Sequence, residues 1–119
     1  MTGKTDWAGY LRVHSDRRNL VIHAIAVPLF AGSFAVFVTA VLFGAFADAG
    51  IALLLALTGM VLQGRGHKFE SHPPEPFSGP GNFLKRWFTE QFVTFPLFVV
   101  SGRWWRQFKA DNGGSGRAA

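Results

Sequence analysis

The sequence contains no cysteine, few charged residues and a single tyrosine, and each shortage narrows its chemistry. Without cysteine, neither a disulfide nor a thiolate metal site can form, so imidazole and carboxylate groups must hold any transition metal. Charged residues make up 16% of the chain, below the roughly 25% of soluble domains. The aromatic residues include 13 phenylalanines, whose rings need no hydrogen-bond partner and suit lipid-facing or buried surfaces. The composition therefore favours a membrane protein.

The length of 119 residues suits one domain rather than two. We expect a single membrane-embedded helical domain over residues 1–110 and a flexible C-terminal tail over residues 111–119. A net charge of +5 is compatible with nucleic acid or with anionic lipid as a partner. The basic residues cluster beside the apolar stretches, and no Lys/Arg-rich run is interleaved with aromatics. We therefore expect contact with a lipid bilayer and none with nucleic acid.

Two apolar stretches predict a helical hairpin, because Asp48 is the only charged residue between Asn19 and Gly64. Residues 20–44 are long enough to span a hydrocarbon core, which takes about 20 helical residues, and Asn19 is predicted to cap their helix. A turn signal lies at residues 46–50, and residues 50–62 need the next four residues to complete a second span. The pattern predicts an all-α, small integral membrane protein, although a buried hairpin in a soluble bundle has a similar pattern.

Shorter segments flank this hairpin. Residues 5–18 place Trp7, Tyr10, Leu11 and His14 on one face of an amphipathic helix. Residues 71–82 hold four of the six prolines, which predicts an irregular loop. Residues 83–101 are predicted to form an interfacial or re-entrant helix kinked at Pro96, although a third span is also compatible with the pattern. An aromatic and basic anchor follows at residues 103–109.

The basic residues predict the orientation of the hairpin. They precede and follow it, whereas its tip carries none. The positive-inside rule therefore predicts a multi-pass protein with both termini in the cytosol, as in a bacterial inner membrane.

The four histidines are predicted to gather at the cytosolic end of the hairpin: His14, His23, His67 and His72. The first two are nine residues apart, so they can face one ion only if the backbone breaks within residues 15–19. His67 and Glu70 share a helix face if the second helix continues through them. His72 precedes Pro73 and is expected to leave the helix direction.

Imidazoles with one carboxylate and open coordination positions are the ligand set of non-haem iron(II) oxygenases. The cluster therefore predicts a metal site, and the ligand types leave iron and zinc both open. Other roles for the histidines are helix capping and interfacial hydrogen bonding. A non-enzymatic membrane protein that binds metal or serves as a lipid-binding scaffold is the alternative function, and a homo-oligomer stays open.

Two motifs carry a resemblance: H-x4-N-x3-H at His14, Asn19 and His23, and G-H-x2-E at residues 66–70. Paired across an apolar hairpin, they resemble the Mpo1-like family of membrane 2-hydroxy fatty acid dioxygenases. The resemblance extends over roughly residues 7–109. After Glu70 the chain departs from the fungal pattern and resembles a bacterial branch.

The resemblance implies an Fe(II)-dependent oxidoreductase that cleaves a 2-hydroxy fatty acid with O₂ by α-oxidation, giving a product one carbon shorter. It implies that His14, His23 and His67 are metal ligands, and that Asn19 and Glu70 have catalytic or supporting roles. His72 is a further candidate ligand that could instead contact the substrate. Four basic residues are expected to attract the substrate carboxylate: Arg17, Arg18, Arg65 and Lys68.

Overall fold

The computed structural model describes residues 6–110, so the tail expected at residues 111–119 lies outside the described part. Within it every regular element is helical, which confirms the predicted all-α class. The elements are α1 (Trp7–Arg12), α2 (Arg17–Leu42), α3 (Phe46–His67), α4 (Pro80–Thr89), the π-helical turn η1 (Glu90–Thr94), α5 (Phe95–Val100) and α6 (Arg103–Ala110).

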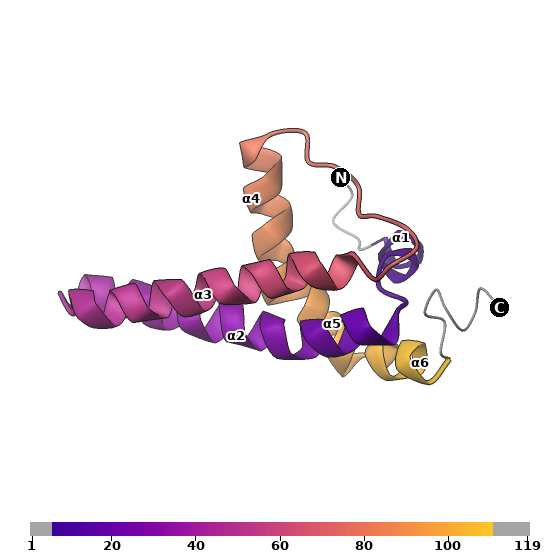
Figure 1. The fold of residues 1–119 in the computed structure, drawn as a ribbon, viewed down its shortest axis with the longest axis horizontal. Helices are drawn as coiled ribbons and strands as arrows, with labels where there is room; N and C mark the ends of the chain where they lie inside the picture. The colour runs from indigo at the N-terminus through magenta and orange to yellow at the C-terminus, as the bar shows by residue number, and fades with distance from the viewer. Residues whose placement is uncertain (1–5, 111–119) are drawn as a thin grey trace.

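Helices α2 and α3 form a long antiparallel hairpin (Figure 1). Both are long and apolar enough to cross a membrane. Small residues line the side of α3 that is buried in the hairpin: Ala49, Ala52, Ala56, Gly59 and Gly66. A Cβ atom at Gly59 would lie 3.0 Å from the carbonyl oxygen of Ala26 and 3.1 Å from the amide nitrogen of Phe30. The two backbones therefore approach closely, as small residues permit between membrane helices.

The tip of the hairpin lies earlier in the chain than the turn expected at residues 46–50, and that expectation is wrong. The chain turns between Phe43 and Ala45, where Gly44 adopts a φ of +72°. Glycine adopts this left-handed conformation without steric cost and therefore ends α2. Asp48 lies in the first turn of α3, where the positive end of the helix dipole stabilises a carboxylate.

The start of α2 also differs from the prediction, because Asp16 and not Asn19 is the N-cap. The Asp16 side chain accepts a hydrogen bond of 2.8 Å from the Arg18 amide. Asn19 lies inside the helix and is fully buried, so its side chain is directed into the protein. Asp is as good an N-cap as Asn, and Asp16, three residues before Asn19, caps α2.

The helix predicted at residues 83–101 extends from Pro80 to Val100 and contains the π-helical turn η1. In this turn the Phe95 amide donates to the Glu90 carbonyl, five residues earlier. Proline disrupts an α-helix because it lacks an N–H group and its ring collides with the carbonyl four residues before it. The wider winding directly before Pro96 accommodates this defect, so the chain continues as helix α5.

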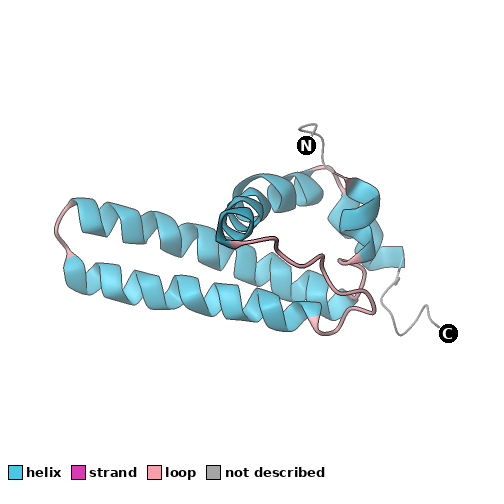
Figure 2. Ribbon diagram, turned by 90° about the horizontal axis from the view of Figure 1, so that it is seen from above, coloured by secondary structure: helices cyan, strands magenta, loops and turns pink. Residues whose placement is uncertain are grey.

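The open end of the hairpin is covered by α1, α5 and α6, while its other end projects away from them (Figures 1 and 2). Four buried residues form the core at the covered end: Leu20, Val27, Phe95 and Phe98. The projecting helices expose many large apolar side chains, among them Leu42, Phe46, Ile51 and Leu54. In the most apolar 18-residue stretches of α2 and α3, only 22% and 28% of the residues are buried. Apolar surface of this kind is suited to lipid, and the histidines lie at the opposite, covered end.

Candidate metal centre

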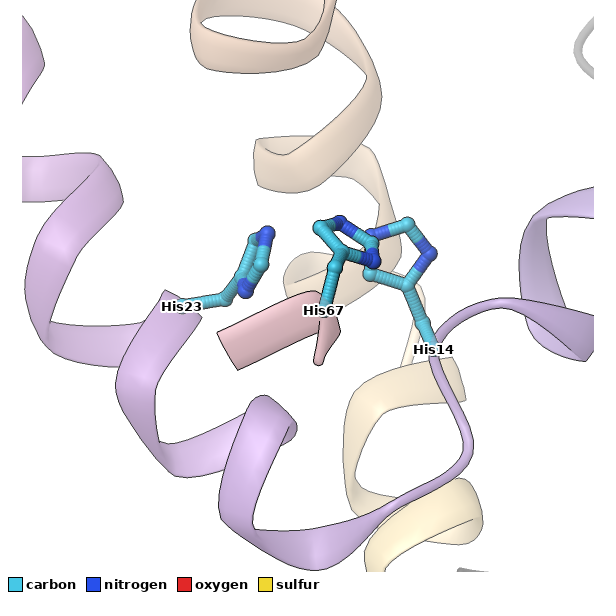
Figure 3. A group of neighbouring side chains, drawn as sticks. All are labelled: His14, His23 and His67. Atoms are coloured by element: carbon cyan, nitrogen blue, oxygen red, sulfur yellow. The ribbon is translucent and has the colours of Figure 1, made fainter. Parts of the chain in front are cut away.

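Three of the four histidines meet at the covered end of the hairpin (Figure 3). His14 follows α1, His23 lies in α2, and His67 is the last residue of α3. Their ring centroids are 4.7–5.1 Å apart, and the nitrogen atoms that could bind a metal all lie within 4.8 Å of one another. His14 and His23 are 4% and 1% exposed. The chain thus brings three segments distant in sequence to one point.

The corner between α1 and α2 lets His14 face His23, as the nine-residue spacing requires. Helix α1 ends at Arg12 and α2 begins at Arg17, so His14 lies in a non-helical connection. The backbone therefore breaks between the two histidines, at residues 13–16, slightly earlier than the expected residues 15–19. The break follows from the cap at Asp16, whose extended conformation (ψ 131°) starts a new helix direction.

Backbone carbonyls fix the tautomers of two rings. The Nδ1 atoms of His14 and His23 lie 2.9 and 3.2 Å from the carbonyl oxygens of Tyr10 and Asn19. A carbonyl only accepts hydrogen bonds, so each Nδ1 carries the proton and donates it. Each Nε2 therefore keeps its lone pair, and such outward hydrogen bonds are the usual way in which metal-binding histidines are oriented.

The unpaired nitrogens fit a metal ion. Nε2 of His14 and Nδ1 of His67 are buried without a hydrogen-bond partner, while the Val13 backbone is hydrogen-bonded to the His67 imidazole. Unpaired buried nitrogens are costly and call for a ligand. A metal with bonds of about 2.1 Å joins nitrogens at most about 4.2 Å apart, so small ring movements complete the fit. Three imidazoles with remaining open positions suit zinc, copper or iron in a reactive rather than a closed structural site.

The environment keeps the His14 imidazole neutral. Burial lowers the pKa of His14 well below its ordinary value of 6.5, and the neighbouring rings of His23 and His67 lower it further. The hydrogen bond to the Tyr10 carbonyl opposes this shift but does not reverse it. Neutral imidazole is the form that binds metal, so no proton has to be displaced at neutral pH.

Glu70 holds the corner before α2. The condition for a shared helix face with His67, a second helix that continues through both residues, is not met. Helix α3 ends at His67, so the next residues turn away from its direction. The Glu70 carboxylate accepts hydrogen bonds of 2.7–3.1 Å from the backbone amides of Ser15 and Asp16, the Ser15 hydroxyl and the Asn19 side chain. It thereby joins the end of α3 to the segment directly after His14.

Asn19 connects Glu70 to the close contact between the two long helices. Its Nδ2 donates to Glu70 at 2.7 Å, and a Cβ atom at residue 66 would collide with its Oδ1. Glycine at residue 66 therefore leaves room for the Asn19 amide. The residues of the two motifs contact one another in the structure. Their histidines converge, Gly66 leaves room for the Asn19 side chain, and Glu70 accepts a hydrogen bond from Asn19.

Glu90, which no sequence motif singles out, has its carboxylate beside His14. Its Oε2 lies 3.6 Å from Nε2 of His14 and accepts a hydrogen bond of 2.9 Å from the Tyr10 hydroxyl. The Tyr10 ring stacks on His14 at 3.9 Å between centroids. Burial raises the pKa of Glu90 to about 7, against the opposing effect of the Tyr10 hydrogen bond. The only signal in the sequence was an isolated acidic residue within a Phe-rich helix.

His72 lies apart from the other histidines. It is exposed in the loop after α3, and its Nδ1 is 3.4 Å from the hydroxyl of the neighbouring Ser71. It does not belong to the group of side chains that could hold one ion.

The four basic residues expected to attract substrate are all exposed. Arg17 donates to the Phe108 carbonyl and lies over its ring, and Arg18 is paired with Asp16 and lies over the Phe69 ring. Arg65 and Lys68 stand at the end of α3 beside His67 in the sequence. They contribute positive charge around the site and are not buried within it.

A known protein family matches most of this chain. The model of a family described as 2-hydroxy-palmitic acid dioxygenase Mpo1-like matches residues 2–97, more than half of the chain. No curated protein and no solved structure matches the chain.

Proposed function

This chain belongs to the Mpo1-like family, and we propose that it is an iron(II)-dependent dioxygenase acting on 2-hydroxy fatty acids. With O₂ as the oxidant, the carboxyl carbon would leave as CO₂, and the other products would be an acid one carbon shorter and water. The observation that carries the proposal is the convergence of three histidines, two of them buried and His67 partly buried, whose possible ligand nitrogens lie within 4.8 Å of one another. The family description supplies the class of substrate and the type of reaction.

His14, His23 and His67 would hold the ion, and iron bound there would supply the redox chemistry that O₂ requires. A 2-hydroxy acid has a hydroxyl and a carboxylate, both of which are oxygen ligands that a metal ion could bind. Neutral imidazoles preserve the positive charge of the ion, which attracts the acid. The surrounding rings of Phe95 and Phe98 exclude water from the reacting groups.

Glu70 and Asn19 would act as positioning residues, because their hydrogen bonds hold the corner that carries His14. Four exposed basic residues would attract the acid to this end of the protein, as long-range charge does for anionic ligands: Arg17, Arg18, Arg65 and Lys68. His72 would contact the substrate from the loop or remain outside the reaction.

We further propose that α2 and α3 cross the bilayer, with the metal centre and both termini on the cytosolic side. The length, hydropathy and exposed apolar surface of these helices support this arrangement. The basic residues around the centre favour the cytosolic side. A fatty acid dissolved in the membrane would then reach the ion with its acyl chain still in apolar surroundings.

Metal analysis and oxygen uptake test the proposal. The full chain is purified in detergent without oxygen, its iron and zinc are measured, and O₂ uptake is followed with 2-hydroxyhexadecanoic acid and with hexadecanoic acid. We expect one iron per chain and uptake only with the hydroxy acid. Bound metal without uptake would favour the metal-binding scaffold. Equal uptake with both acids would contradict binding through the 2-hydroxyl.

A further inference from the structure

A pair of buried amides includes Gln63, one helical turn before His67 on α3, and does not belong to the group of side chains that could hold an ion. Nε2 of Gln63 donates to Oε1 of Gln91 at 2.9 Å, and Nε2 of Gln91 donates to Oε1 of Gln63 at 2.7 Å. Both residues are 1% exposed. We call these two residues the amide pair.

The amide pair is adjacent to the metal centre along two separate elements. Gln63 lies four residues before His67 on α3, so the two share one helix face and Gln63 is about 6 Å deeper along the hairpin. Gln91 directly follows Glu90, whose carboxylate faces His14. The π-helical turn η1 therefore places Glu90 near one metal-binding ring and Gln91 against the helix that carries another. The amide pair bounds the centre on the side of the apolar hairpin.

The unused hydrogen-bonding capacity of the amide pair includes a donor on each residue. Each glutamine amide has two N–H groups and a carbonyl oxygen with two lone pairs. The mutual hydrogen bonds use one N–H group and one lone pair of each residue. Each residue thus retains an N–H group that can meet an acceptor, which suits a carboxylate, because an ionised carboxylate only accepts hydrogen bonds.

Charged donors are missing from the same region. No lysine or arginine within residues 6–110 is buried, and the basic residues around the centre are exposed. A carboxylate that enters the buried site therefore meets no cationic side chain there, and the carboxyl group of Glu90 also lies beside His14. Apolar side chains of similar volume would fill the interface equally well, since replacing both partners of a buried hydrogen bond can be nearly neutral. Packing alone gives no reason for two amides here.

We propose that the amide pair binds the carboxylate of the 2-hydroxy acid, with an unused amide N–H donating to a carboxylate oxygen. This inference rests on the proposed function and adds a substrate-binding element to it. Gln63 and Gln91 thereby set the preference for an acid over an alcohol of the same chain length.

Ligand binding without oxygen tests this role separately from turnover. The full chain in detergent is loaded with iron(II), and dissociation constants are measured for 2-hydroxyhexadecanoic acid and for hexadecane-1,2-diol, which lacks the carboxylate. The variant is the double substitution Gln63→Leu and Gln91→Leu, which removes both partners together. Thr94→Val is the matched control, because it changes a buried polar residue of the same π-helical turn outside the amide pair.

The double variant should retain the wild-type iron content. Its dissociation constant for the acid should rise about 10- to 100-fold, the loss expected for a hydrogen bond to a charged group, and that for the diol should stay unchanged. Thr94→Val should leave both constants unchanged. An unchanged affinity for the acid in the double variant would overturn the inference, and so would an equal loss for acid and diol.

Gln91→Met decides the question if the double variant does not fold. It keeps the length and the neutrality of the side chain, and it removes the N–H donors without adding a charge. Affinity for the acid should fall at least tenfold while the diol binds as before, and unchanged affinity would overturn the inference. A wild-type chain that binds neither iron nor acid would instead refute the proposed function itself.

Discussion

Replacing Glu70 with alanine tests whether the carboxylate at the end of α3 holds His14 in place. Four donor groups direct their hydrogen bonds to this carboxylate, and three of them belong to Ser15 and Asp16, directly after His14. Each hydrogen bond to a charged group contributes about 1.5–3 kcal/mol, although such values do not add. Water reaches part of this site, so we expect a total loss of roughly 3 kcal/mol and a Tm lower by roughly 10 °C.

The same substitution should weaken metal binding, although Glu70 would not touch the ion. Loosening the corner lets His14 leave the centre, and loss of a group that orients a ligand typically weakens metal affinity about 10- to 100-fold. Chelator competition measures the affinity, and thermal unfolding in detergent measures the stability. Glu75→Ala is the control, because Glu75 is exposed in the following loop. If Glu70→Ala bound metal as tightly as the wild type, the reasoning about the corner would be refuted.

Three further predictions concern the ligands, the helix contact and pH. Alanine in place of His14, His23 or His67 should abolish stoichiometric metal binding with the fold retained by circular dichroism, whereas His72→Ala should bind metal normally; retention of metal by all three would exclude the ligand set. Gly66→Ala should lower stability by about 1–3 kcal/mol, because the new Cβ atom displaces Asn19. Gly64→Ala is the control: open space surrounds this residue, so thermal unfolding should show stability raised by about 0.5–1 kcal/mol. Equal effects of the two substitutions would contradict the close contact between Gly66 and Asn19. The hydrogen bond from Arg18 lowers the pKa of Asp16 below 3.8, so the charge of Asp16 stabilises the protein above pH 3.8 and ceases to do so as the pH falls through the lower, folded-state pKa. At neutral pH, Asp16→Asn should lower the Tm by an amount that corresponds to about 0.5 kcal/mol, because Arg18 is exposed. This difference should disappear in acid. A Tm difference independent of pH would contradict a stabilising role for the charge of Asp16.

The hairpin and the three converging histidines could be predicted because they depend on local patterns and on chain direction. Two apolar stretches joined by a short turn must bring their outer ends together, and the spacing of His14 and His23 demanded a break. The turn was misplaced because Asp48 and Gly50 look like turn residues, whereas the left-handed conformation falls at Gly44. Capping by Asp16 was missed because Asn19 stands closer to the apolar run.

Glu90 and the amide pair could not be found from spacing, because their positions depend on a π-helical turn and on contacts between elements far apart in sequence. A π-helical turn changes which residues share a face, and no residue type specifies it. Glu70 belongs to a recognisable motif, but its hydrogen bonds to Ser15 and Asp16 depend on how the end of α3 packs against the corner before α2. The spacing of the motif does not specify that packing.

The proton positions on His14 and His23 are dictated by main-chain oxygens four residues earlier, and this has a consequence for any redesign of the protein. Exchanging the side chains of Tyr10 or Asn19 leaves those oxygens where they are, so mutation there cannot reverse which nitrogen is available. Only rewinding the peptide backbone could do so. The proton arrangement of these two rings is therefore encoded within residues 10–23, whereas the corner between them still needs the Glu70 carboxylate from the end of α3.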